Sequence, residues 1–365
     1  MQQFQDSEFP EIRLANAKIQ LIRDETGAIA TRINATGGAS MLQMGASLDG
    51  RHLEFWPLRG MNSNPKPPAP MVPVFLLSDE EQFFGRTCPK CRGYFRTERI
   101  AENLYCPYCS THAPLAYFTT GNQLEFINAV RLQYIEGFQG GALEVIDLDA
   151  IAKALPNNRP SWAYSEERQQ HLSTCSGCNN RFDILGEYGF CPACGRSNAL
   201  TTLLSQLDAS QAEFQRIESE LSDRGDRAAE WEKMTKCISE FEAMARAIQN
   251  DLTRLPLTPS RRQEIRQISY QQILSAGDYM RTYFGIDLLK GLTEDEKAFL
   301  NKMFNRRHIL THNAGRVDEK YLNRTGDSSV RLHQKITVRS REIARLIPLL
   351  RRVAQNLFAG YESIT

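Results

Sequence analysis

Cys88-Pro89-Lys90-Cys91, followed after 14 residues by Cys106-Pro107-Tyr108-Cys109, decides how the first half of this 365-residue chain folds. The pattern recurs as Cys175-Ser176-Gly177-Cys178, followed after 12 residues by Cys191-Pro192-Ala193-Cys194. A two-residue spacer within each pair lets a tight turn direct both sulfurs toward one point, and two such pairs supply four thiolates. The sequence therefore predicts two structural zinc sites, each formed by pairs that are neighbours in sequence, in two zinc ribbons.

Disulfide bonds are the other common fate of paired cysteines. The sequence has no signal peptide and no apolar run of about 18 residues, so we expect a cytoplasmic protein with no membrane span, in which thiols stay reduced. Reduced thiols favour zinc over disulfides. The ninth cysteine, Cys237, lies within a heptad pattern of apolar residues, and we expect its side chain to be packed rather than reactive.

A histidine upstream of the first cysteine pair raises the possibility of a catalytic zinc site. His52-Leu53-Glu54 and the first pair loosely resemble the deaminase pattern H-x-E…P-C-x-x-C, in which zinc activates a water molecule. Thr87 replaces the proline of that pattern, and Cys106 and Cys109 complete the four ligands without a histidine. We therefore expect a closed structural site and not a deaminase.

Short elements are expected around and between the two ribbons. Alternating apolar and polar residues predict half-buried strands, and helical spacing of apolar residues predicts a helix. The expected elements are strands at 12–22 and 28–33 with a turn at 24–27, a proline-rich connector at 62–73, a helix at 122–138, a strand at 143–148 and a polar loop at 156–168. Within the ribbons, Tyr94-Phe95 and Tyr188-Gly189-Phe190 are predicted to form short hairpin strands.

Helical patterns dominate the second half of the chain. Apolar residues from Trp231 to Leu252 recur in steps of three and four, which predicts a long helix. We expect its apolar stripe to be part of the hydrophobic core. Pro256 and Pro259 end this helix, because neither can continue it. Further helices are expected at 203–221, 260–283, 293–315 and 338–358, the last kinked at Pro348. Joined by short loops, the four helices from 231 onward predict an antiparallel four-helix bundle.

The third helix of this predicted bundle ends with the hexapeptide Arg307-His308-Ile309-Leu310-Thr311-His312. Thr293-Glu294-Asp295-Glu296 is a capping-box pattern at its start, and Gly315 suits its end. Arg307 falls in the middle of the apolar face, where a charge is costly unless it meets an anion. His312 lies at the rim of that face. Arginine can bind a phosphate and histidine can move a proton near neutral pH, so this helix is a candidate site for cutting a phosphodiester.

The hexapeptide also allows two other interpretations. Arg307 could bind a carboxylate or reach water, and His312 could interact with the negative end of the helix dipole. His308 and His312, four residues apart, could also bind a metal. The zinc-protease pattern has Glu after its first histidine, however, and this chain has Ile309 there.

The charge of the chain is unevenly distributed. Residues 255–365 contain 19 basic and 11 acidic side chains, a net charge of +8, in a protein whose total is +1. Arginine outnumbers lysine in this segment by 14 to five, which favours bidentate contacts with phosphate. A solvated helix surface would account for part of this charge. The excess nevertheless indicates a polyanion-binding region.

A helical bundle with an R-x4-6-H motif at the end of its third helix resembles the HEPN superfamily (higher eukaryotes and prokaryotes nucleotide-binding domain). The resemblance covers at most residues 226–365 and depends on Arg307 and His312, with His308 and Asn313 at matching polar positions. It implies a metal-independent endoribonuclease of the kind found in toxin and anti-phage defence systems. Arg307 would stabilise charge on the phosphate, His312 would transfer the proton, and His308 and Asn313 would orient the scissile group. It also implies a homodimer, because a two-fold related copy completes the site.

These patterns predict a multidomain α+β chain, with a β-rich N-terminal region and two zinc ribbons followed by an all-α four-helix bundle. The expected division is 1–80 as the β-rich region, 81–118 as ribbon 1, 119–165 as a connecting region, 166–200 as ribbon 2, 201–225 as a linking helix and 226–365 as the HEPN-like bundle. The preferred hypothesis is an endoribonuclease that cuts single-stranded RNA and leaves a 2′,3′-cyclic phosphate, with the ribbons recognising RNA, a protein partner or a regulator. The alternative is a non-enzymatic zinc-ribbon adaptor that binds nucleic acid.

Overall fold

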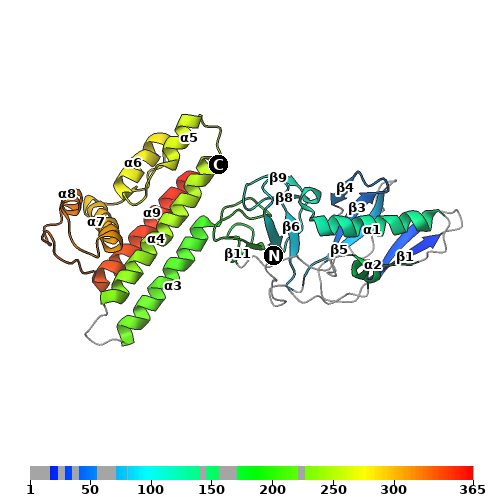
Figure 1. The fold of residues 1–365 in the computed structure, drawn as a ribbon, viewed down its shortest axis with the longest axis horizontal. Helices are drawn as coiled ribbons and strands as arrows, with labels where there is room; N and C mark the ends of the chain where they lie inside the picture. The colour runs from blue at the N-terminus through cyan, green and yellow to red at the C-terminus, as the bar shows by residue number, and fades with distance from the viewer. Residues whose placement is uncertain are drawn as a thin grey trace. The chain divides into compact units, whose positions relative to one another are not determined.

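The computed structural model describes residues 17–23, 29–34, 41–55, 71–79, 81–139, 145–155, 171–220 and 227–364. The chain forms two compact units, Met1–Asn198 and Ala199–Thr365. Figure 1 shows strands gathered in the first unit and long helices in the second. The predicted order, a β-rich region with two tetracysteine groups followed by a helical region, is confirmed.

Two small antiparallel sheets build the start of the first unit. Their strand orders are β10 (Val145–Asp147), β1 (Lys18–Arg23), β2 (Ile29–Asn34) and β4 (Leu53–Phe55), β3 (Met41–Ser47), β5 (Met71–Leu77). Strands β3 and β5 are each buried at six of seven positions. A strand buried on both faces has no polar alternation, and the sequence patterns therefore did not predict these two. The start of β5 lies inside the stretch that was expected to be a connector.

Helix α1 (Gly121–Phe138) packs against β5 and anchors the core of this region. Its start is a capping box, in which Thr120 and Gln123 exchange hydrogen bonds between side chain and backbone. The Tyr134 hydroxyl donates to the Pro73 carbonyl of β5 over 2.9 Å. A short helix, α2 (Leu148–Ala154), follows β10 and contacts both α1 and β1.

The two cysteine-rich segments share one four-stranded sheet. Its order is β11 (His171–Thr174), β12 (Arg181–Ile184), β7 (Tyr94–Thr97) and β6 (Phe84–Thr87). Strands β8 (Asn103–Tyr105) and β9 (His112–Pro114) form a separate hairpin, followed by the 3-10 helix η2 (Leu115–Phe118). The expected strand at Tyr94-Phe95 is present as β7. The one expected at Tyr188–Phe190 is wrong, because Phe190 forms only an isolated bridge with Ser197.

Seven helices make up the described part of the second unit. They are α3 (Ala199–Glu220), α4 (Arg227–Leu252), α5 (Pro259–Arg266), α6 (Ile273–Phe284), α7 (Glu294–His312), α8 (Glu319–Thr325) and α9 (Ser340–Glu362). Figure 1 shows α3, α4 and α9 running side by side, and these three helices contact one another in pairs. Helix α7 contacts α4, α6, α8 and α9. The segment expected to be a linking helix thus packs as α3 against α4 and α9.

The single helix expected at 260–283 is two helices in the structure. Helix α5 ends at Arg266 and α6 begins at Ile273. The buried Gln249 side chain of α4 donates to the carbonyls of Ile265 and Ile268. This amide satisfies backbone groups that a continuing helix would bond internally, so it stabilises the break. Helix α9, by contrast, continues through Pro348.

The expected turn at 24–27 and the polar loop at 156–168 lie outside the described residues, as does most of the connector at 62–73. Among the described helices, none is both long and apolar enough to cross a bilayer.

Candidate metal centres and candidate active site

Both tetracysteine groups have the geometry of a closed zinc site. In each group all four sulfur atoms lie within 4.8 Å of one another. Sulfur–sulfur distances are 3.5–3.7 Å for Cys88–Cys109, Cys91–Cys106, Cys175–Cys194 and Cys178–Cys191. With Zn–S bonds of about 2.3 Å, a regular tetrahedron places its sulfurs about 3.8 Å apart, so each donor set fits one zinc ion. The predicted ligands and their pairing are confirmed.

The chemistry of these cysteines agrees with the geometry. None of the nine cysteines forms a disulfide. Burial raises the pKa of the Cys106 and Cys191 thiols, so these sulfurs need a cation to become thiolates. Four thiolates leave no open coordination position, which defines a structural rather than a catalytic zinc site.

All four cysteine pairs adopt the same backbone conformation. In each pair, the N–H of the first cysteine donates to the carbonyl of the residue five positions later. The N–H of the residue four positions later donates to the carbonyl of that first cysteine, and all these bonds are 2.7–3.0 Å long. The residue after each second cysteine has a positive φ, between 54° and 75°, at Arg92, Ser110, Asn179 and Gly195. Only one of these is glycine, so the hydrogen bonds and the zinc ligands hold three side-chain-bearing residues in the left-handed region.

The two ribbons pair around a local two-fold axis. In the antiparallel pair β7·β12, Arg96 lies opposite Asp183. These residues are equivalent, because each lies five positions after the second cysteine of its ribbon's first pair. An antiparallel pair whose equivalent residues face each other has a two-fold axis between them. The ribbons therefore associate as a pseudo-symmetric dimer within one chain.

The second cysteine pairs of the ribbons repeat the same symmetry. Tyr105 N–H donates to the Pro192 carbonyl over 2.8 Å, and Phe190 N–H donates to the Pro107 carbonyl over 2.9 Å. The four residues occupy equivalent positions, because Tyr105 and Pro107 flank Cys106 as Phe190 and Pro192 flank Cys191. The Tyr108 hydroxyl adds a further link, donating to Tyr94 of its own ribbon and accepting from Leu185 N–H of the other.

Arg96 is the centre of a buried ion cluster. Its side chain is 4% exposed and pairs with Asp79 at 2.7 Å, Glu81 at 2.9 Å and Asp183 at 2.7 Å. Burial alone would lower the pKa of Arg96, but the carboxylates of Asp79 and Asp183 raise it above its usual value. The guanidinium also lies 4.9 Å from the ring centroid of Phe83.

Helix α7 begins and ends as its sequence predicts. Thr293 and Glu296 form the capping box, and Gly315 takes φ 73° just beyond the last turn. The Asn313 amide donates to the Arg316 carbonyl over 2.7 Å, so this predicted site residue closes the turn after the helix.

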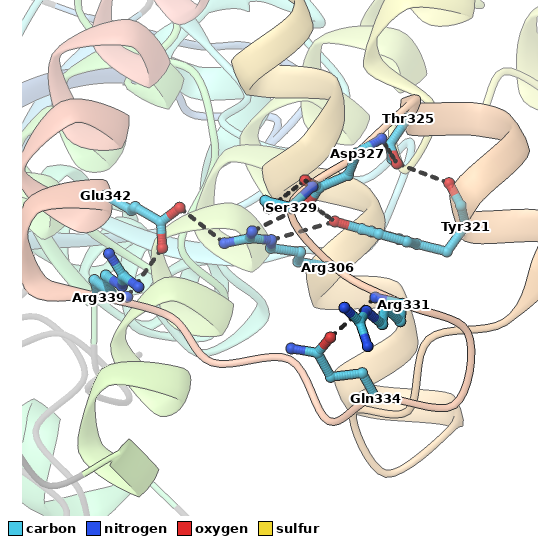
Figure 2. A network of polar contacts seen from close by, with 9 residues as sticks. All are labelled: Arg306, Tyr321, Thr325, Asp327, Ser329, Arg331, Gln334, Arg339 and Glu342. Atoms are coloured by element: carbon cyan, nitrogen blue, oxygen red, sulfur yellow. Dashed lines mark hydrogen bonds and ion pairs between the residues drawn. The ribbon is translucent and has the colours of Figure 1, made fainter.

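The buried arginine of α7 is Arg306, which is 4% exposed and precedes the predicted motif (Figure 2). Its guanidinium donates to Glu342 at 2.8 Å, Asp327 at 3.2 Å and the Tyr321 hydroxyl at 3.3 Å. Tyr321 donates in turn to Asp327 at 2.7 Å. This network connects α7 to α8, to the loop after it and to α9. Arg306 is also within motif distance of His312, but its donors are committed to these partners.

Burial of Asp327 would by itself raise its pKa. Hydrogen bonds from Ser329 and Tyr321, together with Arg306, instead lower it to about 2. The Arg306–Asp327 pair is therefore ionised throughout the physiological range.

Arg307 points toward α4. Its side chain is 15% exposed, lies 3.6 Å from the Glu242 carboxylate and donates to Ser239 Oγ over 3.2 Å. The pair is imperfect, because the buried Nε of Arg307 and Oε1 of Glu242 have no hydrogen-bond partner within the described chain. The pKa of Glu242 lies above its usual value, because the effect of burial exceeds the lowering by the charges of Arg307 and Arg246. In this structure Arg307 therefore pairs with a carboxylate, which is one of the alternatives that the sequence allowed.

The two predicted histidines lie together on the outer side of α7. The ring centroids of His308 and His312 are 4.8 Å apart, and the His312 residue is exposed. Partial burial lowers the pKa of His308, and the charges of His312, Lys320 and Arg324 lower it further. His308 is therefore neutral at pH 7 and can accept a proton. No third metal-ligating side chain joins the two histidines in the described residues.

Five exposed basic residues lie between positions 316 and 335, after the histidines in the chain. They are Arg316, Lys320, Arg324, Arg331 and Lys335, here named the α7–α8 basic surface. Within the described residues none of the five forms an ion pair with a carboxylate, whereas Arg281 of the same unit pairs with Asp278 at 2.8 Å. Arg316 and Lys335 lie opposite each other in a β-bridge. Exposed cations that no carboxylate neutralises suit an anionic ligand.

The sequence patterns missed the charged residues at the centre of both units. Arg96 and Asp183 occupy matching positions of the duplicated cysteine pattern, and that offset could have shown their equivalence. Arg306 is adjacent to a second arginine, and no spacing rule in the sequence shows which of the two is the more buried. Comparison with protein-family models, with curated proteins and with solved structures finds no match for this chain.

Proposed function

We propose that the helical unit is an endoribonuclease whose active site includes Arg307, His308 and His312. The observation that carries this proposal is the histidine pair, with ring centroids 4.8 Å apart, beside the α7–α8 basic surface. Two adjacent imidazoles supply a proton acceptor and a proton donor, and unpaired cations attract a phosphodiester backbone. The R-x4-H resemblance to the HEPN superfamily supports the same assignment.

The proposed reaction is transesterification within the RNA strand. The 2′-oxygen forms a bond to the adjacent phosphorus and loses its proton to an imidazole, for which the neutral His308 is suited. The P–O5′ bond breaks, and the leaving oxygen takes a proton from His312. The products are a 2′,3′-cyclic phosphate and a free 5′-hydroxyl. The proposed step uses no metal, and the two tetracysteine zinc sites offer no open coordination position to a substrate.

Arg307 would stabilise the negative charge on the phosphoryl oxygens. In the structure this guanidinium pairs with Glu242. A substrate phosphate must therefore compete with that carboxylate, and the unpaired atoms on both side chains keep the pair from being fully satisfied.

We further propose that the unit is a variant of the four-helix bundle and forms a homodimer, in which the histidine-bearing sides of two α7 helices face each other. Two copies of His312 would then lie beside one phosphate, and Arg307 would reach that phosphate by leaving Glu242. The proposed compartment is the cytoplasm, where eight zinc-binding thiols stay reduced, and the proposed biological context is a toxin or defence effector. The zinc-ribbon pair would recognise RNA or a protein regulator.

The decisive experiment is incubation of the purified full-length protein with mixed single-stranded RNA in the presence of EDTA. Wild type should cut and should leave cyclic phosphate ends. His312→Ala should cut RNA ~10²–10⁴-fold more slowly than wild type, and Arg307→Ala should cut it ~10²–10³-fold more slowly. Matched controls are His52→Ala, an exposed histidine of the other unit, and Arg352→Ala, whose guanidinium is also 3.6 Å from a glutamate. Both controls should keep wild-type rates.

The second candidate is an adaptor that binds nucleic acid without cutting it. The Arg307–Glu242 pair favours it, because this arginine already has a carboxylate partner and does not require a substrate phosphate. Cleavage that persists in both alanine variants, that depends on added metal or that cuts DNA equally well would reject the proposed site. RNA binding without any cleavage would establish the adaptor.

A further inference from the structure

Two tyrosines form an exposed aromatic stack on α6. The rings of Tyr279 and Tyr283 lie one helical turn apart, with centroids separated by 5.8 Å and planes inclined by only 13°. Tyr279 is 48% exposed, more than any other large hydrophobic residue in the described part of the helical unit. A parallel pair is a rigid arrangement, so the exposed ring of Tyr279 is held in place for a ligand.

Arg261 of α5 completes this group. Its guanidinium carbon lies 4.2 Å from the ring centroid of Tyr283, within the range of a cation–π contact. The contact connects α5 to α6 and limits the rotation of the Tyr283 ring. The same guanidinium forms a solvent-exposed ion pair with Glu264 at 3.5 Å, and its other N–H groups can donate to phosphate oxygens.

The surroundings of the stack indicate what kind of ligand it suits. The exposed residues of α6 on either side of Tyr279 are polar, namely Ser275, Asp278, Arg281 and Thr282. A protein-binding patch would be expected to place apolar neighbours around its aromatic centre. A nucleobase needs only the ring face, while its phosphates contact cations, and the same unit carries the five unpaired cations of the α7–α8 basic surface.

We propose that Tyr279, supported by Tyr283 and Arg261, is a stacking site for unpaired nucleobases of an RNA strand. The proposal deepens the proposed function and rests on it, because it names single-stranded RNA as the substrate class. Helix α6 packs against α7, so the site is on a helix that contacts the helix carrying the histidine pair. Bases in a duplex are stacked on each other and cannot reach the ring.

The test is binding of full-length protein to a fluorescein-labelled 2′-O-methyl oligonucleotide, which lacks the nucleophilic 2′-hydroxyl and resists the proposed cleavage. Tyr279→Ala should weaken binding of the single strand by about 5- to 150-fold, the range that follows from ~1–3 kcal/mol per stacked base. Tyr279→Phe should stay within about two-fold of wild type, and Tyr279→Leu should resemble alanine. Leu332→Ala, at another exposed apolar position of the same unit, is the matched control.

Wild-type binding by Tyr279→Ala, equal binding by the leucine and phenylalanine variants, or an equal loss on a duplex would each overturn the stacking site. A wild-type protein that does not bind the single strand would do the same. The proposed function fails separately, if natural RNA binds with the predicted Tyr279 dependence but is not cut. Conversely, cleavage that needs His312 while Tyr279→Ala binds normally rejects only the stacking site.

Discussion

Arg96 and Asp183 lie opposite each other across the local two-fold axis of the zinc-ribbon pair, and their side chains form a buried ion pair at 2.7 Å. Perfect symmetry would place two identical residues here, and two arginines or two aspartates would repel. The pair therefore favours association of unlike ribbons within one chain. It also joins strands that belong to different zinc sites.

Arg96→Met should strongly destabilise the ribbon pair. Removing the guanidinium leaves the buried carboxylates of Asp79 and Asp183 without a cation, a change that typically costs ~3–5 kcal/mol. Urea unfolding of the zinc-loaded protein, followed by zinc release to a chromogenic chelator, measures this loss as a lower midpoint. Glu98→Gln is the control, because Glu98 pairs with Arg181 at 3.9 Å with both side chains about 40% exposed. It should cost less than ~1 kcal/mol, and equal midpoints for both variants would contradict the cluster's role.

Zinc content should be two ions per chain, and the two sites should be coupled. Cys194→Ser removes a ligand of the second site and should leave about one zinc per chain by elemental analysis. Because Phe190 and Pro192 of that ribbon bond to the first ribbon, the remaining zinc should also exchange faster with chelator. An unchanged exchange rate would show that the ribbons are independent. A content below one zinc in wild type would reject both sites.

Local patterns in the sequence were sufficient for some parts of this structure and not for others. Cysteine spacing identified both zinc sites, because ligation geometry depends on a few neighbouring residues. The capping box at Thr293 and the stop at Gly315 fixed α7 for the same reason. Strands β3 and β5 were missed because their burial is continuous, and the α5–α6 break depends on Gln249, which is distant in sequence.

The candidate site shows the same limit. The histidine pair follows from helical spacing alone, since residues four apart share a face. The partner of Arg307 could not be predicted, because Glu242 is on a different helix. The choice of Arg306 as the structural arginine depends on Asp327 and Glu342, which tertiary packing brings to it.

Arg306→Met and Arg307→Met should separate a structural role from a chemical one. Arg306 has two carboxylate partners and 5% side-chain exposure, so its loss should cost ~3–5 kcal/mol of unfolding free energy. Arg307 has one imperfect pair, so its loss should cost much less stability and mainly reduce RNA cleavage. Thermal unfolding and cleavage rates measured on the same preparations make the comparison. A larger stability loss for Arg307→Met would contradict these assignments.

Gly315→Ala should destabilise the end of α7. Gly315 has φ 73°, and an added Cβ would lie 3.0 Å from both Trp231 and Leu310. A left-handed residue with a side chain costs ~1–2 kcal/mol by itself, and the close contacts add to it. Gly326→Ala is a matched control, with φ 59° and no atom within 4 Å of the added Cβ. Thermal unfolding should show a clearly larger loss at Gly315, and equal losses would mean that Trp231 moves aside freely.

Asp251→Asn should stabilise the helical unit above pH 6. Burial raises the pKa of Asp251 from 3.8 to about 6, because its side chain is only 15% exposed. The positive charge of Arg254 offsets only part of this rise. Between these two pH values the folded protein holds a proton that the unfolded chain releases, so stability falls as pH rises and then stays reduced. The shift corresponds to ~2–3 kcal/mol at neutral pH.

Asparagine does not titrate, so the variant should lose this pH dependence. The unfolding free energies of Asp251→Asn and wild type should diverge from about pH 4 to pH 6 and differ by a constant amount above it. Taking the difference removes the contribution of zinc release at low pH, which both proteins share. Asp278→Asn is the control, because Asp278 pairs with Arg281 at the same spacing while 71% exposed. Its difference from wild type should stay below ~1 kcal/mol and show no such divergence. Parallel stability curves for Asp251→Asn and wild type would mean that Asp251 is ionised at no cost in the folded protein.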